Sequence, residues 1–173
     1  MFKTPLITFL CFILFCSIIS CENAHVAREK RAASSANVKL GLAYLNEGLQ
    51  QESKKKLLAA LEKDPKNSAA YTAFGYFLEQ SGENKDAERY YKKAISIATS
   101  ENQGANYNNY GTYLYRQQRY DEAISYFLKA ISVQNYTNIA SAYENASLAA
   151  KKMGNNKLAK DYLQKATQHG RIN

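Results

Sequence analysis

The chain has 173 residues, which is enough for one compact domain and a short targeting segment. Glycine and proline are scarce, at 8 and 2 copies, so the composition disfavours a turn-rich sheet protein and favours helices. The formal net charge of +8 suits nucleic acid, anionic lipid or an acidic protein. Nucleic acid is disfavoured, because the sequence has no zinc-finger spacing, no ribonucleoprotein motif and no long basic run.

The first 20 residues have the features of a secretory signal peptide. Lys3 gives a positive start, and residues 5–20 are almost wholly apolar. This apolar stretch is short for a membrane-spanning helix, which needs about 20 residues. Residues 18–21 (IISC) resemble the bacterial lipobox, in which a small residue precedes the cysteine that becomes the lipidated N-terminus. Cys11 and Cys16 each follow a bulky residue and do not fit this pattern.

We therefore expect residues 1–20 to be removed and Cys21 to be lipidated. The cysteine of a lipobox carries lipid through a thioether, and several acyl chains such as palmitate anchor a protein stably, at about 0.8 kcal/mol per buried methylene. Glu22 follows the cysteine, where an aspartate retains many lipoproteins at the inner membrane, so the resemblance implies an outer-membrane protein that faces the periplasm. An uncleaved anchor with an incidental cysteine is the alternative.

Residues 21–33 separate this predicted anchor from the rest of the chain. They are polar and have no apolar stripe of useful length. We interpret them as a flexible tether between lipid and domain, in which His25 is solvated.

Small residues recur through the remainder with a period of 34 to 36 residues. Gly41 and Gly75 are 34 residues apart, as are Ala60 and Ala94, and Gly111 follows Gly75 after 36. This period resembles that of the tetratricopeptide repeat (TPR) family, whose repeat is a pair of antiparallel helices. We therefore expect an all-α solenoid of about eight helices, wound as a right-handed superhelix with a concave groove. The domain is expected at residues 34–173, with repeats at 34–67, 68–101, 104–137 and 140–173.

The residue types within the repeats fit helix pairs. A glycine or alanine is expected where two helices cross closely, with tyrosine, phenylalanine or leucine beside it. Gly48, Gly82 and Gly154 are expected to end the first helix of a pair in the left-handed conformation. Gln118 occupies the corresponding position of the third repeat.

The first helix of each repeat is expected to line the concave groove. One end of this groove is aliphatic, and its middle is rich in asparagine and tyrosine. This mixture suits an extended peptide, because asparagine amides bond a peptide backbone and tyrosine covers its side chains. The predicted partner-binding residues are Val38, Leu42, Leu45, Thr72, Tyr76, Gln80, Asn108, Asn109, Thr112, Tyr115, Arg116, Glu144, Asn145 and Leu148.

No catalytic constellation is visible. His25 and His169 have no ligand-spaced partner, and the sequence has neither a nucleophile motif nor a glycine-rich phosphate loop. We therefore expect a protein that is not an enzyme and that takes no cofactor, metal or small-molecule substrate.

Residues 106–123 carry a more specific pattern. Their sequence, NYNNYGTYLYRQQRYDEA, resembles the third repeat of the PilF/PilW family of type IV pilus biogenesis lipoproteins, where an N-N-Y-G segment leads into R-Q-x-R-Y-E-E-A. Residues 143–146 (YENA), followed by Gly154, resemble the next repeat of that family. Tyr115 and Ser147 depart from residues that are common there.

The resemblance implies a pilotin, which helps a secretin reach the outer membrane and multimerise into the ring through which the pilus emerges. Twitching motility depends on such pili. The expected partners are a type IV pilus secretin and, through the lipid anchor, the membrane. A TPR scaffold lipoprotein for barrel-protein insertion or peptidoglycan synthesis stays open as an alternative, as does an accessory subunit of a periplasmic enzyme.

Overall fold

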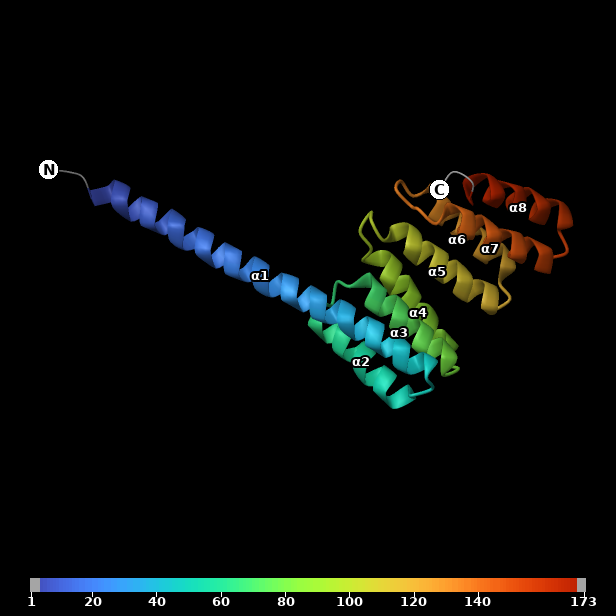
Figure 1. The fold of residues 1–173 in the computed structure, drawn as a ribbon, viewed down its shortest axis with the longest axis horizontal. Coiled ribbons are helices and arrows are strands. Elements are labelled where there is room, and N and C mark those ends of the chain that lie inside the picture. Colours follow the sequence, from blue (N-terminus) through green and yellow to red (C-terminus); the bar gives the residue numbers. More distant parts are fainter. Residues whose placement is uncertain (1–3, 171–173) are drawn as a thin grey trace.

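The computed structural model describes residues 4–170, and the side chains of residues 24–170. The described residues form eight α-helices and no strands, which confirms the predicted fold class. Consecutive helices form four antiparallel pairs that stack side by side (Figure 1). The helices are α1 (Thr4–Asn46), α2 (Gln50–Lys63), α3 (Ser68–Gln80), α4 (Asn84–Ser96), α5 (Gln103–Arg116), α6 (Tyr120–Ser132), α7 (Ile139–Lys152) and α8 (Asn156–Gly170).

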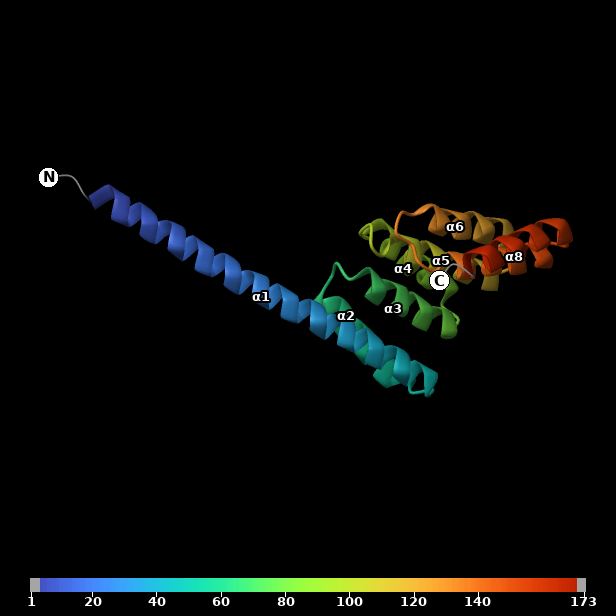
Figure 2. The same ribbon diagram turned by 45° about the horizontal axis from the view of Figure 1, so that its top comes forward.

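The segment before the first repeat is helical, whereas the sequence led us to expect a flexible tether. Residues 21–33 belong to α1, which projects from the stacked helices as a rod (Figures 1 and 2). The physical reason is local: this segment is rich in alanine, glutamate, arginine and lysine, which have high helix propensity. The packed part of α1 supplies the helical nucleus from which the segment continues. We call residues 24–33 the stalk.

The predicted signal peptide and Cys21, the predicted lipidation site, lie outside the residues whose side chains are described. Among the residues that the structure does describe, no helix combines the length and the apolarity required to cross a membrane.

Tertiary packing of α1 begins at Ser34, whose side chain is fully buried. Its hydroxyl donates to the carbonyl oxygen of Ala60 at 2.8 Å and accepts from Nδ2 of Asn67 at 2.8 Å. The Asn67 side chain also caps α3, because its Oδ1 accepts the backbone N–H groups of Ala69 and Ala70. One buried serine therefore joins the first repeat to the start of the second.

The predicted close crossings of paired helices are confirmed in the third repeat. A Cβ atom added to Gly111 of α5 would lie 2.8 Å from the Phe127 ring of α6, so a larger residue would force that buried ring to move. Phe127 and Tyr110 fill the space beside the crossing and are almost fully buried. The fourth repeat has Ser147 at the equivalent position, and its hydroxyl donates to the carbonyl oxygen of Ala159 at 2.7 Å.

The turns within the helix pairs also follow the prediction. Gly48, Gly82 and Gly154 have φ angles of 77°, 80° and 77°. Gln118 takes the same left-handed conformation with φ of 61°, although its side chain makes that conformation unfavourable by about 1 kcal/mol. The third turn is therefore built like the others and carries a small strain.

Candidate partner-binding groove

The first helices of the four pairs line two adjoining hollows. The inner hollow, of about 370 Å³, lies among α1, α3 and α5. The second hollow, of about 220 Å³, lies between α5 and α7. Thr112 and Arg116 line both hollows, so the two form one groove with Arg116 at the divide.

Most of the predicted groove residues line this groove. Those in the inner hollow are Val38, Leu42, Thr72, Tyr76, Asn109, Thr112 and Arg116, and the second hollow adds Tyr115, Asn145 and Leu148.

Four predicted groove residues line neither hollow: Leu45, Gln80, Asn108 and Glu144. Leu45 packs against the core, and Oδ1 of Asn108 accepts a hydrogen bond from Asn145 at 3.3 Å. Gln80 and Glu144 are exposed. Helical position alone does not explain the difference, because Gln80 and Glu144 each lie four residues from a groove residue, Tyr76 and Leu148, on nearly the same side of the helix.

A buried ion pair fixes the middle of the groove. The Arg116 guanidinium of α5 donates to both oxygens of Glu79 in α3, each at 2.6 Å. The Glu79 side chain is only 6% exposed, whereas that of Arg116 is 36% exposed. The guanidinium also lies 5.5 Å from the centre of the Tyr76 ring, and the Tyr91 hydroxyl donates to Glu79 at 3.1 Å. This bidentate arrangement orients both partners.

Burial and the neighbouring charges shift the pKa values of this cluster. Burial, together with the negative charge of Glu79, raises the pKa of Tyr91, so its hydroxyl stays protonated and donates. Burial alone would lower the pKa of Arg116, but its hydrogen bonds to Glu79 and the attraction of that carboxylate together outweigh burial and raise it. Arg116 is therefore a permanent cation whose charge Glu79 neutralises.

Asn106 supports the floor of the inner hollow. It is 4% exposed, and its Nδ2 donates to the carbonyl oxygen of Ala94 at 3.3 Å. Its Oδ1 accepts a hydrogen bond from the Thr72 hydroxyl at 3.1 Å. This pair holds α5 beside α3.

Two of these residues escaped the sequence analysis although the repeats contain a signal for each. Glu79 lies 36 residues before Tyr115, so it occupies the same position of its repeat. A carboxylate is unusual at this half-buried position, where the third repeat has a tyrosine. Asn106 corresponds to Ala70 and Ala142, both fully buried. A polar residue that replaces a buried small residue in one repeat needs a specific hydrogen-bond partner. A polar residue at such a position can therefore be recognised from the sequence as a candidate for a specific contact.

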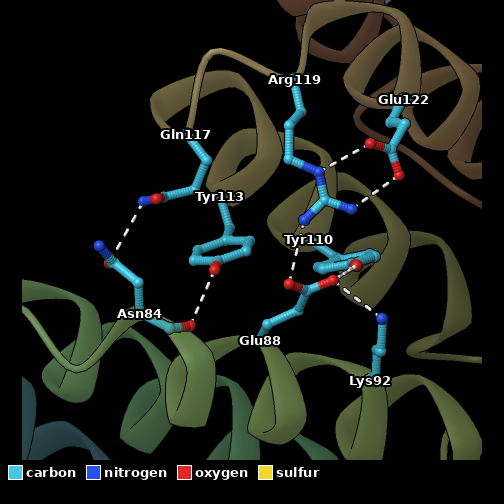
Figure 3. A network of polar contacts seen from close by, with 8 residues as sticks. All are labelled: Asn84, Glu88, Lys92, Tyr110, Tyr113, Gln117, Arg119 and Glu122. Carbon is cyan, nitrogen blue, oxygen red and sulfur yellow. Dashed lines mark hydrogen bonds and ion pairs between the residues drawn. The ribbon is translucent and has the colours of Figure 1, made fainter.

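A second polar cluster joins α4, α5 and α6 (Figure 3). Glu88 accepts hydrogen bonds from the Tyr110 hydroxyl at 2.7 Å and from the Arg119 guanidinium at 3.0 Å, and Nζ of Lys92 lies 2.8 Å away. Arg119 also binds Glu122 at 2.7 Å. Burial opposes ionisation of Glu88, but these hydrogen bonds outweigh it and lower its pKa to about 2.

Tyr113 and Gln117 extend the same contact to the start of α4 (Figure 3). The Tyr113 hydroxyl donates to the carbonyl oxygen of Asn84 at 2.9 Å, and Nε2 of Gln117 donates to the Asn84 side chain at 3.3 Å.

The groove offers mostly neutral chemistry. Of the residues that line its two hollows, Arg116 alone is charged, and Glu79 balances that charge. Apolar side chains such as Val38 and Leu42 share the lining with the amides of Asn109 and Asn145. Such a lining suits a polypeptide segment with apolar side chains. Within residues 24–170, no group of histidine, cysteine and acidic side chains has a metal-binding arrangement.

Comparison with known proteins assigns the helix pairs to a repeat family. Two tetratricopeptide-repeat family models match the chain, at residues 102–169 and 56–89. The chain is therefore a TPR protein, a class of solenoid that mediates protein–protein interactions. No curated protein sequence matches it.

Among solved structures, the chain is similar to PilF of Pseudomonas aeruginosa, with 34% identity and a TM-score of 0.73 over 83% of this chain and 64% of that chain. It is also similar to PilW, described as a widely conserved type IV pilus biogenesis factor, with 27% identity and a TM-score of 0.68 over 77% of this chain and 60% of that one. The chain thus spans somewhat less than two thirds of either protein. A third similar structure is MamA, with 24% identity and a TM-score of 0.64 over 80% of this chain and 79% of that chain. This similarity shows a common fold and nothing more.

Proposed function

We propose that this protein is an outer-membrane lipoprotein that acts as a pilotin for a type IV pilus secretin. It binds secretin subunits in its groove and promotes their localisation and multimerisation in the outer membrane. The observation that carries the proposal is the combination of a peptide-sized groove with 34% identity to PilF across the repeats. The lipobox-like residues 18–21 support the membrane location.

The proposed mechanism divides the work between the two ends of the protein. Acyl chains on Cys21 hold it at the membrane, and the helical stalk keeps the first packed residue, Ser34, about 20 Å along the helix from the anchor. A secretin segment places apolar side chains against Val38, Leu42 and Tyr76. Because the anchor concentrates the groove at the membrane surface, modest affinity for each subunit is sufficient.

The first test is a gel of unboiled outer membranes, with and without the gene, blotted for the type IV pilus secretin of the same organism. Loss of the high-mass ring, with monomer left in the inner membrane, is the expected result. An unchanged ring in the outer membrane would reject the pilotin role and favour a TPR scaffold for another envelope machine. The Cys21→Ser variant is expected to lose labelling by radioactive palmitate and to reproduce the defect of the deletion.

The groove itself is tested with the double variant Asn109→Ala/Tyr115→Ala. Both residues line the groove, one in each hollow, so the variant is expected to pull down less secretin while its circular dichroism stays helical. The matched control is Asn156→Ala/Gln164→Ala on the exposed surface of α8. Undiminished pull-down by the groove variant, equal to that of the control, would contradict the groove assignment.

A further inference from the structure

The groove continues into a larger outer hollow of about 960 Å³ beside the stalk. One wall is the stalk end of α1, which contributes Lys30, Arg31 and Ser35. The other walls are the turn between α2 and α3 (62–68) and the turn between α4 and α5 (99–102). The stalk therefore forms part of a recessed surface, because α1 stays helical before it reaches the repeats.

The outer hollow and the inner hollow share two lining residues, Ser68 and Asn102. The two hollows therefore adjoin, and a polypeptide that extends from one to the other follows a path beside Ser68 and Asn102. Ser68 is 1% exposed at this junction, and its hydroxyl has no hydrogen-bond partner among the described residues.

The chemistry changes along this path from neutral to charged. Lys30 and Arg31 on the stalk, with Lys63 and Lys66 on the turn, give the outer hollow four cations. None of the four forms an ion pair with another described residue.

Three acidic residues share the lining: Glu62, Asp64 and Glu101. Asp64 is engaged within its own turn, because its Oδ1 accepts the backbone N–H of Lys66 at 3.0 Å. The stalk wall has cations and no acid among its lining residues. The stalk side of the hollow is therefore the part that attracts negative charge.

We propose that the outer hollow binds an acidic stretch of the same polypeptide whose apolar part occupies the groove. This inference rests on the proposed function of the groove as a protein-binding site, and it makes the stalk a part of that site. A protein segment fits better than a lipid surface, because the four cations line a concave surface that a flat layer of headgroups does not enter. The partner then makes two kinds of contact: its apolar residues lie over α3 and α5, and its carboxylates lie beside Lys30 and Arg31.

The test uses the full chain in detergent micelles and fluorescein-labelled decaglutamate, with binding followed by fluorescence anisotropy at low salt. The variant Lys30→Glu/Arg31→Glu reverses both stalk cations. Its matched control, Lys54→Glu/Lys55→Glu, makes the same change of net charge on exposed residues of α2. Circular dichroism verifies that both variants remain helical.

We expect decaglutamate to bind the unchanged protein and the control with similar affinity, and to bind the stalk variant about tenfold more weakly. Equal weakening in both variants would mean that net charge alone attracts the peptide and would overturn the proposal, as would absence of binding to the unchanged protein. Binding of a soluble short-chain phosphatidylglycerol, with the same dependence on Lys30 and Arg31 and without binding of decaglutamate, would assign the hollow to lipid headgroups instead. No secretin enters this assay, so its result is independent of the pilotin test.

Discussion

The junction between the second and third repeats, which we call the central junction, is held by charged and tyrosine side chains. Arg116 binds Glu79 across it, and Glu88 accepts hydrogen bonds from Arg119 and Tyr110. These contacts have fixed directions, so they set how the third repeat is rotated against the second.

The junction between the third and fourth repeats, the C-terminal junction, is built differently. Among the described residues, the hydrogen bond from Asn145 to Asn108 is the one side-chain hydrogen bond that crosses it. Helix α7 is otherwise buried there through small side chains such as Ala142, Ala146 and Ala149, all 0% exposed. Packing of this kind is non-directional and does not depend on ionisation.

The comparison shows that one solenoid can join its repeats in two ways. The central junction contributes Arg116 to the groove and fastens it on a buried carboxylate, so groove shape and repeat geometry are coupled there. The C-terminal junction has no ion pair among its described side chains, and its groove residue Asn145 is linked across it by a single neutral hydrogen bond. Mutations and pH should therefore affect the two junctions unequally.

The largest effect is expected from Arg116→Ala, which leaves the carboxylate of Glu79 buried without its cation. We expect the free energy of unfolding in urea to fall by about 3 kcal/mol, somewhat less than for fully buried pairs because Arg116 is 36% exposed. The control is Arg89→Ala, which breaks the exposed pair with Asp86 and should change stability by about 0.5 kcal/mol or less. Equal losses of unfolding free energy in the two variants would contradict the prediction that the buried ion pair contributes more than the exposed one.

Acid should weaken the central junction through Glu88. Its pKa in the folded state is about 2, below the ordinary value of 4.5, so the ionised carboxylate stabilises the fold above pH 4.5. This contribution is lost as the pH falls from 4.5 toward 2, and solvent screening limits it to about 1–2 kcal/mol. Urea unfolding at several pH values should show a steeper loss for the unchanged protein than for Glu88→Gln. Parallel profiles would contradict this role.

Asn145→Ala addresses the C-terminal junction and should have a smaller effect. Removal of its hydrogen bond to Asn108 is expected to lower the free energy of unfolding by about 1 kcal/mol or less. Asn156→Ala, on the exposed start of α8, serves as the control. A loss as large as that of Arg116→Ala would mean that this junction too depends on a polar contact.

Gln118→Gly should have the smallest effect, and it should stabilise. Glycine takes φ of 61° without strain, but it also gains freedom in the unfolded chain, so we expect a net gain of about 0.5 kcal/mol. The reverse change, Gly82→Gln at φ of 80°, should lower stability by about 1 kcal/mol. Thermal unfolding measures both, and opposite signs are the required outcome.

Much of the groove could be predicted from the sequence, because side chains on the first helix of a repeat face inward at regular intervals. Val38, Thr72 and Tyr76 were found in this way. The intervals failed at Gln80 and Glu144, which are exposed and line neither hollow although Tyr76 and Leu148, four residues away on the same helices, do. A repeat pattern gives the position of a residue along a helix, whereas the exact face depends on how neighbouring pairs cross.

The polar composition of residues 21–33 predicts a flexible tether, and this prediction is wrong. The same residues favour a helix once α1 packs against α2 and α3. Tertiary contacts hold the packed part of α1 in a helix, and this helix extends into the stalk, which has no core of its own. The outer hollow exists because of this extension.

Residue types and their spacing predict the helix pairs, their period and the left-handed turns at Gly48, Gly82 and Gly154, because these features depend on residues close together in the chain. The ion pair of Glu79 with Arg116, 37 residues apart, is visible only in the folded protein, as is the meeting of the stalk with the turns that form the outer hollow. The physical reason is that periodicity and turn conformation are local properties of the backbone. Which side chains meet across repeats depends on the angle and distance at which whole helix pairs pack.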